Sequence, residues 1–206
     1  MENENNIYKE KSRSAFDKIA SNYSESHDGK FVEPMYEEVI KRILELKPRN
    51  ILDVGCGPGS VLVHLKNKNI GLHGLDISEK MIEEAEKNLG QDVDLRVGDS
   101  ESMPWLDNSF DIILCNASFH HYPNPLKSLK EMKRLLKKDG VLIIGEPTAP
   151  SIIRFITNMS IKYSNKGDVR IYNKKEMESL LEEVGLHPYN YKKINHKSFI
   201  INANII

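Results

Sequence analysis

The sequence is poor in cysteine and lacks any apolar run long enough to cross a bilayer. Its two thiols, Cys56 and Cys115, exclude a disulfide framework. Neither lies in a CxxC pattern, so we predict no bound metal. Residues 1–6 have neither the basic nor the apolar region of a signal peptide. We therefore expect a cytoplasmic protein without a membrane span.

Net charge is also nearly absent. The 29 basic and 30 acidic residues give a formal charge of −1. Such a chain has no large basic field to hold a phosphate backbone, so we expect no nucleic-acid partner. A length of 206 residues with 39% hydrophobic residues suits one globular domain. Composition does not decide between a monomer and a homodimer.

Short apolar runs alternate with amphipathic stretches along the chain. Strands are predicted at 51–54, 71–77, 93–97, 110–115 and 141–145, and a hairpin at 188–194 and 198–205. Helices are predicted at 12–23, 33–46, 60–67, 78–88, 125–137 and 173–184. This alternation predicts an α/β fold with a mostly parallel sheet and helices on both faces. Ligands of such sheets bind at the carboxyl ends of the strands.

A glycine-rich segment, Asp53-Val-Gly55-Cys-Gly57-Pro-Gly59, follows the first predicted strand. Glycines let a backbone pass close to a ligand. A P-loop would need a lysine here, and a dinucleotide fingerprint would need a glycine where Ser60 stands. Asp53 would repel a pyrophosphate and attract an ammonium group. The segment therefore favours a ligand with a cationic amino acid end, and an NAD(P)-dependent oxidoreductase is the less favoured alternative.

The order of the motifs resembles that of class I S-adenosylmethionine (SAM)-dependent methyltransferases, in the methyltransferase type 11 group. The glycine-rich segment resembles the family's cofactor motif. A weaker similarity links 16–23 to the N-terminal helix of the ubiquinone/menaquinone-biosynthesis-like members, although Ser24 stands where those members commonly have Asp. The other matching segments are Gly74–Ser78, Gly98–Glu101 with Met103-Pro104, Phe110–Asn116 with His120-His121, and Leu135–Ile144.

The resemblance implies a Rossmann-like, seven-stranded sheet with an antiparallel C-terminal strand hairpin, built from one domain. We expect an N-terminal helical lid at 1–46, a cofactor-binding core at 47–147, and a substrate-side insertion with the last helix and hairpin at 148–206. The implied cofactor is SAM, the implied product is S-adenosylhomocysteine, and the expected partner is a small-molecule acceptor. The expected cofactor-binding residues are Tyr23, Asp53, Gly55, Cys56, Gly57, Gly59, Asp76, Ile77, Met81, Asp99, Ser100, Glu101 and Asn116.

Two histidines, His120 and His121, follow the fourth predicted strand at the expected active-site edge. Imidazole titrates near neutral pH, so His121, and less favourably His120, is predicted to take a proton from the acceptor. The alternative is a structural or solvent-facing pair. The aromatic and basic segment 149–172 is expected to select a partly apolar acceptor, unless its apolar residues at 152–156 pack onto the core. A SAM-binding protein without methyl transfer is also consistent with these motifs.

Overall fold

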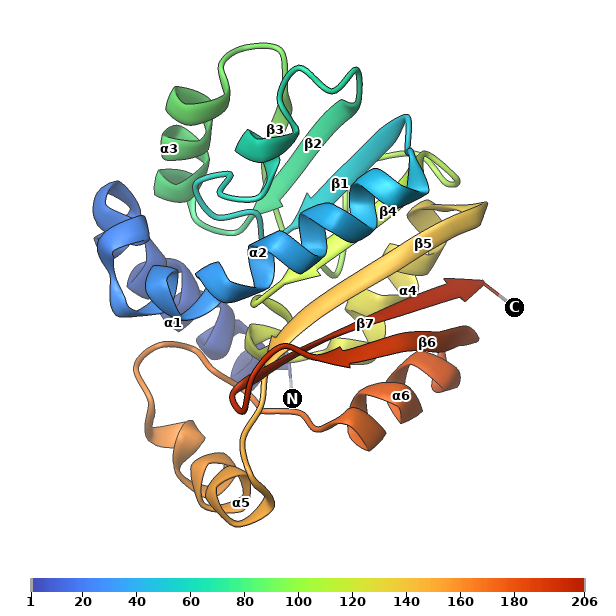
Figure 1. Cartoon of the computed structure of the whole chain (residues 1–206). Coiled ribbons are helices and arrows are strands. Elements are labelled where there is room, and N and C mark those ends of the chain that lie inside the picture. The colour runs from blue at the N-terminus through green and yellow to red at the C-terminus, as the bar shows by residue number, and fades with distance from the viewer. Residues whose placement is uncertain (1, 206) are drawn as a thin grey trace.

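The computed structural model describes residues 2–205 (Figure 1). Its strands are β1 (Asn50–Val54), β2 (Gly71–Asp76), β3 (Asp94–Val97), β4 (Phe110–Asn116), β5 (Leu136–Pro147), β6 (Leu186–Lys193) and β7 (Ser198–Ile205). Its α-helices are α1 (Glu2–Ile19), α2 (His27–Leu46), α3 (Glu79–Leu89), α4 (Pro125–Leu135), α5 (Ser151–Ser160) and α6 (Lys174–Glu183). The 3-10 turns are η1 (Ala20–Glu25), η2 (Leu62–Leu65), η3 (Phe119–His121) and η4 (Ile161–Tyr163).

The described strands form one seven-stranded sheet in the order β3-β2-β1-β4-β5-β7-β6. β1 to β5 pair in parallel, whereas β7 runs antiparallel to both β5 and β6. The predicted fold class, including the antiparallel C-terminal hairpin, is therefore confirmed. The strand order reverses between β1 and β4, which is where a sheet of this kind opens a crevice for a ligand.

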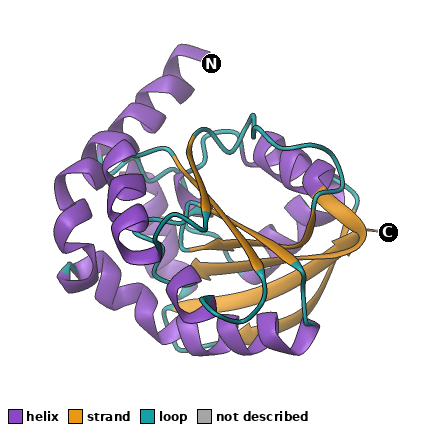
Figure 2. Ribbon diagram, turned by 90° about the horizontal axis from the view of Figure 1, so that it is seen from above, coloured by secondary structure: helices purple, strands orange, loops and turns teal. Residues whose placement is uncertain are grey.

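Helices cover both faces of the sheet (Figure 2). On one face, Met35, Val39 and Ile43 of α2 pack with apolar residues of α3 and the strands. On the other face, α4 and α6 bury Met132 and Met177, among other residues. β4 lies in the middle, and its residues from 112 to 115 are all buried. Burial on both faces explains why its sequence reads as a continuous apolar run.

The N-terminal helices differ from the prediction. α1 begins at Glu2 and α2 begins at His27, which is ten and six residues earlier than the apolar spacing predicts. Ser26 sets the start of α2, because its side chain accepts a hydrogen bond from the backbone N–H of Gly29 at 3.0 Å. Between the two helices, the 3-10 turn η1 replaces the predicted helical residues 20–23.

The helix predicted at 60–67 is wrong, because this segment forms only the four-residue 3-10 turn η2. The segment contains β-branched Val61 and Val63, which lower helix propensity. Asn67 then adopts a left-handed conformation with φ of 63°, which ends any helix. The glycine-rich loop therefore does not open a long helix, and its own backbone must provide the contacts to a ligand.

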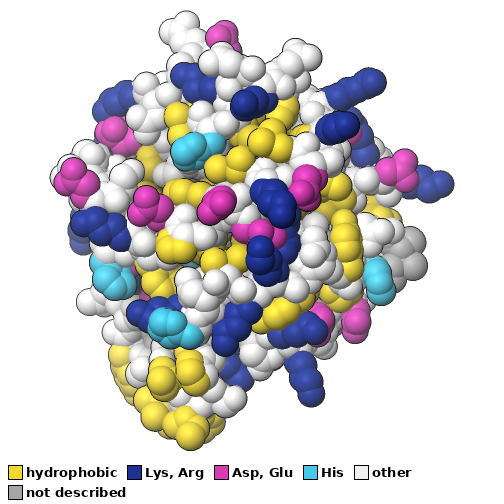
Figure 3. Space-filling view, in the orientation of Figure 1, with side chains coloured by type: hydrophobic (Ala, Val, Ile, Leu, Met, Phe, Trp, Pro, Cys, Tyr) yellow, Lys and Arg dark blue, Asp and Glu magenta, His cyan; other side chains and the backbone are white. Residues whose placement is uncertain are grey.

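The apolar residues of α5 do not pack onto the core, so that alternative is wrong. Ile152, Phe155 and Ile156 are each at least 60% exposed. Apolar side chains gather at the lower end of Figure 3, where Figure 1 places α5. None of the helices formed by residues 2–205 combines the length and the apolar character that a membrane span requires.

Candidate active site

A cavity of about 890 Å³, counting the space open to solvent, lies at the carboxyl ends of β1, β2 and β4. Its size falls within the range of small-molecule sites. Eleven of the thirteen expected cofactor-binding residues line this cavity: Tyr23, Asp53, Gly55, Cys56, Gly57, Asp76, Ile77, Met81, Asp99, Ser100 and Asn116. The structure therefore brings most of the predicted site together, although the segments are distant in sequence.

The glycine loop turns sharply into this cavity. Gly55 and Gly57 adopt φ values of 78° and 53°, which side chains other than glycine rarely tolerate. The backbone N–H groups of Gly55 and Cys56 donate to the carbonyl of Leu75 at 2.7 and 3.0 Å, which joins the loop to β2. No described atom lies within 4 Å of the point where a Cβ on Gly57 would stand. The backbone is thus open to a ligand at this position.

Asp53 is the clearest sign of an ammonium-binding site. Its side chain is buried at 2% exposure, and its Oδ1 has no hydrogen-bond partner within residues 2–205. Burial raises the pKa of Asp53 to about 8, and the nearby carboxylate of Asp76 adds to this rise. A buried carboxylate without a partner is unfavourable, and a cationic group in the cavity would relieve it. A pyrophosphate would worsen it, so the geometry fits SAM better than a dinucleotide.

Asp76 ties two loops together at the end of β2. Its Oδ2 accepts from Gly57 N–H and its Oδ1 from Ser78 N–H, both at 2.9 Å. Burial raises the pKa of Asp76 to about 6, and the hydrogen bonds from these two amides act against the rise. Each carboxylate oxygen can accept further hydrogen bonds, so the side chain can still serve a ribose diol from the wall of the cavity.

The side of the cavity expected to hold adenine contains Met81, Asp99 and Ser100. Asp99 is already engaged, because its Oδ1 accepts from Glu101 N–H at 2.9 Å and its Oδ2 from Lys9 Nζ at 2.7 Å. Lys9 also pairs with Glu101 Oε1 at 2.6 Å. Burial acts to lower the pKa of Lys9, but the two carboxylates outweigh it and raise the pKa. These ion pairs therefore hold α1 over this side of the cavity.

Three predicted site residues lie outside the wall of this cavity. Gly59 packs against α3, since a Cβ there would meet Leu89. Glu101 is buried and engaged by Lys9 and by Asn124, whose amide lies 3.1 Å from both carboxylate oxygens. His120 lines a second, neighbouring cavity instead. Gly59 and Glu101 thus support the site from behind, which their place within the motifs did not indicate.

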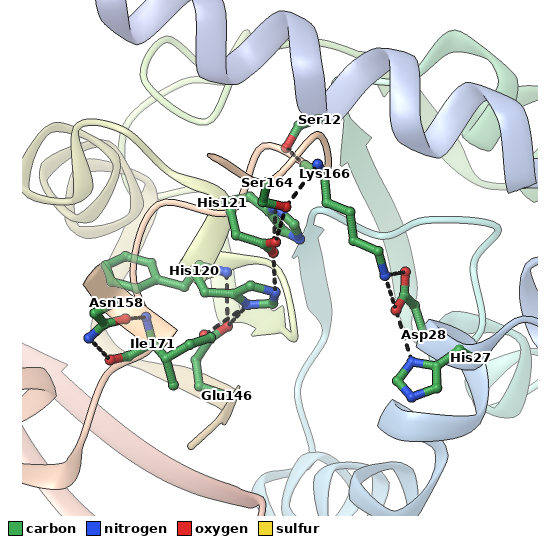
Figure 4. Close-up of polar contacts among 12 residues, drawn as sticks. Ser12, His27, Asp28, His120, His121, Glu146, Asn158, Ser164, Lys166 and Ile171 are labelled. Atoms are coloured by element: carbon green, nitrogen blue, oxygen red, sulfur yellow. Dashed lines mark hydrogen bonds and ion pairs between the residues drawn. The ribbon is translucent and has the colours of Figure 1, made fainter. Parts of the chain in front are cut away.

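His121 is buried and His120 is partly buried at the carboxyl end of β4, and the centroids of their rings lie 4.1 Å apart. His120 Nδ1 lies 3.0 Å from Glu146 Oε2 (Figure 4). Burial acts to lower the pKa of His120, yet Glu146 and Asp168 outweigh it and raise the pKa. Burial, followed by the charge on His120, lowers the pKa of His121 well below its usual value. The base role of His121 stays a prediction.

A second cavity of about 1170 Å³, including open solvent, adjoins the first. It contains both histidines, Phe31 and residues of the segment 157–171. Lys166 of this segment pairs with Asp28 at 2.9 Å, which joins it to the start of α2 (Figure 4). Five of the described residues line both cavities and form a common wall: Phe16, Tyr23, Val32, Ala117 and His121.

Several lining residues were not anticipated as cofactor contacts. Lys9 and Ser12 come from α1, and Tyr36 comes from α2. Ser118 and Tyr122, beyond β4, share a hydrogen bond of 2.8 Å beside Gly55. Only the similarity of 16–23 to a helix that reaches the cofactor pointed in this direction. No local motif marks the other positions, because folding alone brings them to the cavity.

Comparison with known proteins shows which family this chain resembles. Residues 52–144 match the family model described as "Methyltransferase domain". A demethylmenaquinone methyltransferase of Thermotoga maritima is 39% identical over 121 residues, covering 58% of this chain and 52% of the relative. The 27-O-demethylrifamycin SV methyltransferase of Amycolatopsis mediterranei is 29% identical over 153 residues, covering 70% and 56%. These matches span little more than half of the relatives' own length.

Among solved structures, a putative methyltransferase of Haloferax volcanii, in complex with the Trm112 methyltransferase activator, superimposes with a TM-score of 0.81. It is 19% identical, and the match covers 94% of this chain and 96% of that one. At this identity the match is evidence for a shared fold. The sheet order and the reversed β7 define an α/β methyltransferase fold. This chain belongs to the class I SAM-dependent methyltransferases.

Proposed function

We propose that this chain transfers a methyl group from SAM to a small-molecule acceptor that binds in the second cavity. The common wall formed by Phe16, Tyr23, Val32, Ala117 and His121 carries the proposal, because each of these residues faces both cavities. When bound, the cofactor supplies an electrophilic methyl group on a sulfonium. The chain's own contribution is to hold the two reactants against these shared residues and to exclude water.

The first cavity offers a separate group for each part of the cofactor. The unpaired Oδ1 of Asp53 suits the ammonium group. The remaining acceptor positions of Asp76 suit the ribose hydroxyls, and Met81 with Asp99 suits the adenine ring. α1 covers this arrangement through Lys9, which pairs with Asp99 and Glu101. We propose that the N-terminal segment 1–46 acts as the lid in this way.

The second cavity favours an acceptor with an apolar part. Phe16, Phe31, Ile161 and Ile171 contribute apolar or aromatic surface to it. The exposed apolar face of α5 continues from the same side, since η4 follows α5 directly and Tyr163 lines the cavity. The two relatives named above carry the names of organic acceptors, demethylmenaquinone and 27-O-demethylrifamycin SV. These names support an organic molecule as acceptor here.

A labelling experiment tests the proposal. The purified chain is incubated with SAM carrying a radioactive methyl group, together with a cell extract that has been divided into a small-molecule fraction and a macromolecular fraction. We expect label in the small-molecule fraction and release of S-adenosylhomocysteine. The matched controls are Asp53→Asn, which removes the charge facing the cavity, and Asp92→Asn, which changes an exposed aspartate. The first variant should lose transfer and the second should keep it.

Three other results would contradict the proposal. Label in protein or nucleic acid would place the acceptor among macromolecules. Tight SAM binding without any label or product would identify a SAM-binding protein without transfer activity. Binding of NADH in preference to SAM, measured by calorimetry, would instead indicate an oxidoreductase.

A further inference from the structure

Three side chains with metal-binding atoms converge in the wall of the second cavity. His120 and His121 come from η3, and Asp168 comes from the loop between η4 and α6. Asp168 Oδ1 lies 3.8 Å from His120 Nε2 and 3.6 Å from His121 Nδ1. One donor atom from each of the three residues can be chosen so that the three atoms lie within 4.8 Å of one another. The cluster therefore surrounds a single point from two elements that are distant in sequence.

Hydrogen bonds within the described chain satisfy only part of this cluster, and Asp168 Oδ2 accepts one from Ser164 Oγ at 3.1 Å. His120 Nδ1 faces both oxygens of Glu146, at 3.0 and 3.4 Å, so it is the nitrogen that donates a proton there. A neutral His120 then directs the lone pair of Nε2 at the carboxylate of Asp168. His121 Nδ1 is buried and has no hydrogen-bond partner among residues 2–205.

Protonating both rings would not resolve this conflict, because the rings lie 4.1 Å apart and two imidazolium charges would repel each other. A proton on His120 Nε2 or on His121 Nδ1 would face Asp168 Oδ1 at 3.8 or 3.6 Å, which is longer than a hydrogen bond. A cation at the centre of the cluster can accept a lone pair from all three atoms at once.

Glu146 gives the cluster the support that metal-binding histidines usually have. It is completely buried, and it accepts from the backbone N–H of Phe119 at 2.9 Å as well as from His120 Nδ1. A carboxylate behind a histidine fixes the ring and directs its other nitrogen toward a metal. Figure 4 shows His120 between Glu146 and His121 in this arrangement.

We propose that His120 Nε2, His121 Nδ1 and Asp168 Oδ1 bind a divalent first-row transition metal ion, such as Zn²⁺. Two imidazoles and one carboxylate form a donor set that these ions favour. Around a tetrahedral ion with bonds of about 2.0 Å, the ligand atoms lie about 3.3 Å apart. The separations of 3.6 and 3.8 Å between Asp168 Oδ1 and the two nitrogens lie close to this value.

The open coordination position of such an ion faces the second cavity, which all three residues line. It would hold an acceptor that carries an oxygen donor beside the common wall, of which His121 is part. This use of the ion rests on the proposed function, whereas metal binding itself does not. His121 would then act as a ligand rather than as the predicted base, and the expectation of no bound metal would be wrong.

The test measures metal binding without any acceptor. The full chain is treated with a chelator, dialysed, and titrated with Zn²⁺ by calorimetry and with Co²⁺ by visible absorption. We expect one equivalent of each metal to bind, with Co²⁺ absorption bands typical of mixed nitrogen and oxygen ligands. Asp168→Asn and His120→Gln should each weaken binding at least tenfold, whereas His187→Gln, on an exposed residue of β6, should leave it unchanged.

SAM binding provides the control for folding, because neither Asp168 nor His120 lines the first cavity. Both variants should bind SAM with wild-type affinity. The proposal is overturned if neither metal binds with one-to-one saturation, or if Asp168→Asn binds as tightly as His187→Gln. If metal binds but no acceptor is ever methylated, the proposed function fails while the site stands. If chelated enzyme methylates its acceptor at the full rate, only the catalytic use of the ion fails.

Discussion

The carboxyl group of Asp53 is buried away from water, and its Oδ1 has no hydrogen-bond partner among the described residues. The pKa of an aspartate in an unfolded chain is about 3.9, and burial raises the pKa of Asp53 to about 8. Between these values the folded state binds more protons than the unfolded state. The free energy of unfolding therefore falls as the pH rises from about 4 to about 8. The site thus costs stability at neutral pH as long as no cation is bound to it.

The first prediction concerns this cost. Asn cannot ionise, so Asp53→Asn should raise the free energy of unfolding of the ligand-free chain at pH 7.5 by at least about 2 kcal/mol. At pH 5.0 the difference should be much smaller, because Asp53 is then largely protonated in the folded state. Urea unfolding at both pH values measures this, with Asp92→Asn as the exposed control. An equal or lower stability of Asp53→Asn at pH 7.5 would contradict the prediction.

The second prediction concerns SAM affinity. An ammonium group binds the ionised form of Asp53, so binding below pH 8 must release a proton. The affinity for SAM should fall as the pH drops from 8 to 6, by up to about tenfold per unit. Asp53→Asn should bind SAM at least about 30-fold more weakly, from the loss of about 2 kcal/mol of charge pairing. Calorimetry in buffers of different ionisation enthalpy would detect the released proton, and a flat pH profile in the wild type would count against this account.

At the scale of elements, several side chains of α1 contact the walls of the cavities. Lys9 pairs with Asp99 and Glu101, and Asp17 accepts from the hydroxyl of Ser78 at 2.6 Å. Phe16 makes an edge contact with His121 at 5.0 Å between ring centroids. α1 therefore contacts the walls of both cavities.

The third prediction concerns a variant that lacks the ion pairs of Lys9. Lys9→Met leaves the buried Glu101 carboxylate with Lys127 as its remaining cationic neighbour, at 3.4 Å. We expect the free energy of unfolding to fall by about 1 kcal/mol and the SAM dissociation constant to rise several-fold. Hydrogen exchange in α1 should become faster. Lys18→Met changes an exposed lysine on the same helix and should have neither effect. Wild-type exchange rates in the Lys9→Met variant would show that α1 is held by other contacts.

The elements that the sequence predicted well are those with local signals. β4 is a continuous apolar run, and the glycine loop carries its glycines and Asp53 within seven residues. The start of α1 was missed because residues 2–10 lack a regular apolar stripe. Its place over the cavity depends on Lys9 and Asp99, which are 90 residues apart. Likewise Asp168 reaches the histidine pair only through the fold, since no motif joins the loop at 168 to η3.

The segment 60–67 shows the opposite kind of error. Its apolar spacing suits a helix, but Asn67 and Asn69 both adopt left-handed conformations and the chain turns away after four residues. Spacing alone carries no information about where a short segment must end in order to enter the next strand. Residues 66–70 instead form the connection to β2, which begins at Gly71.

At the scale of the whole molecule, the sheet brings both cavities to one edge. The strand order reverses between β1 and β4, and the first cavity lies at the carboxyl ends of these strands. The hairpin of β6 and β7 lies at the other side of the sheet and contributes no residue to either described cavity wall. Ligand binding should therefore slow amide exchange in the N-terminal helices and in the loops after β1, β2 and β3, and should not change it in the hairpin.

The fourth prediction tests this division. S-adenosylhomocysteine keeps the amino acid, ribose and adenine parts of the cofactor, so it should occupy the first cavity without turnover. Saturating product should slow amide exchange in residues 2–25, in the glycine loop 55–59 and in residues 97–100, because α1 and these loops close around one ligand. Exchange in 186–205 should stay unchanged. Protection spread evenly over the sheet would indicate a general stabilisation by binding, whereas protection of the loops without α1 would show that the N-terminal helices do not cover the cofactor.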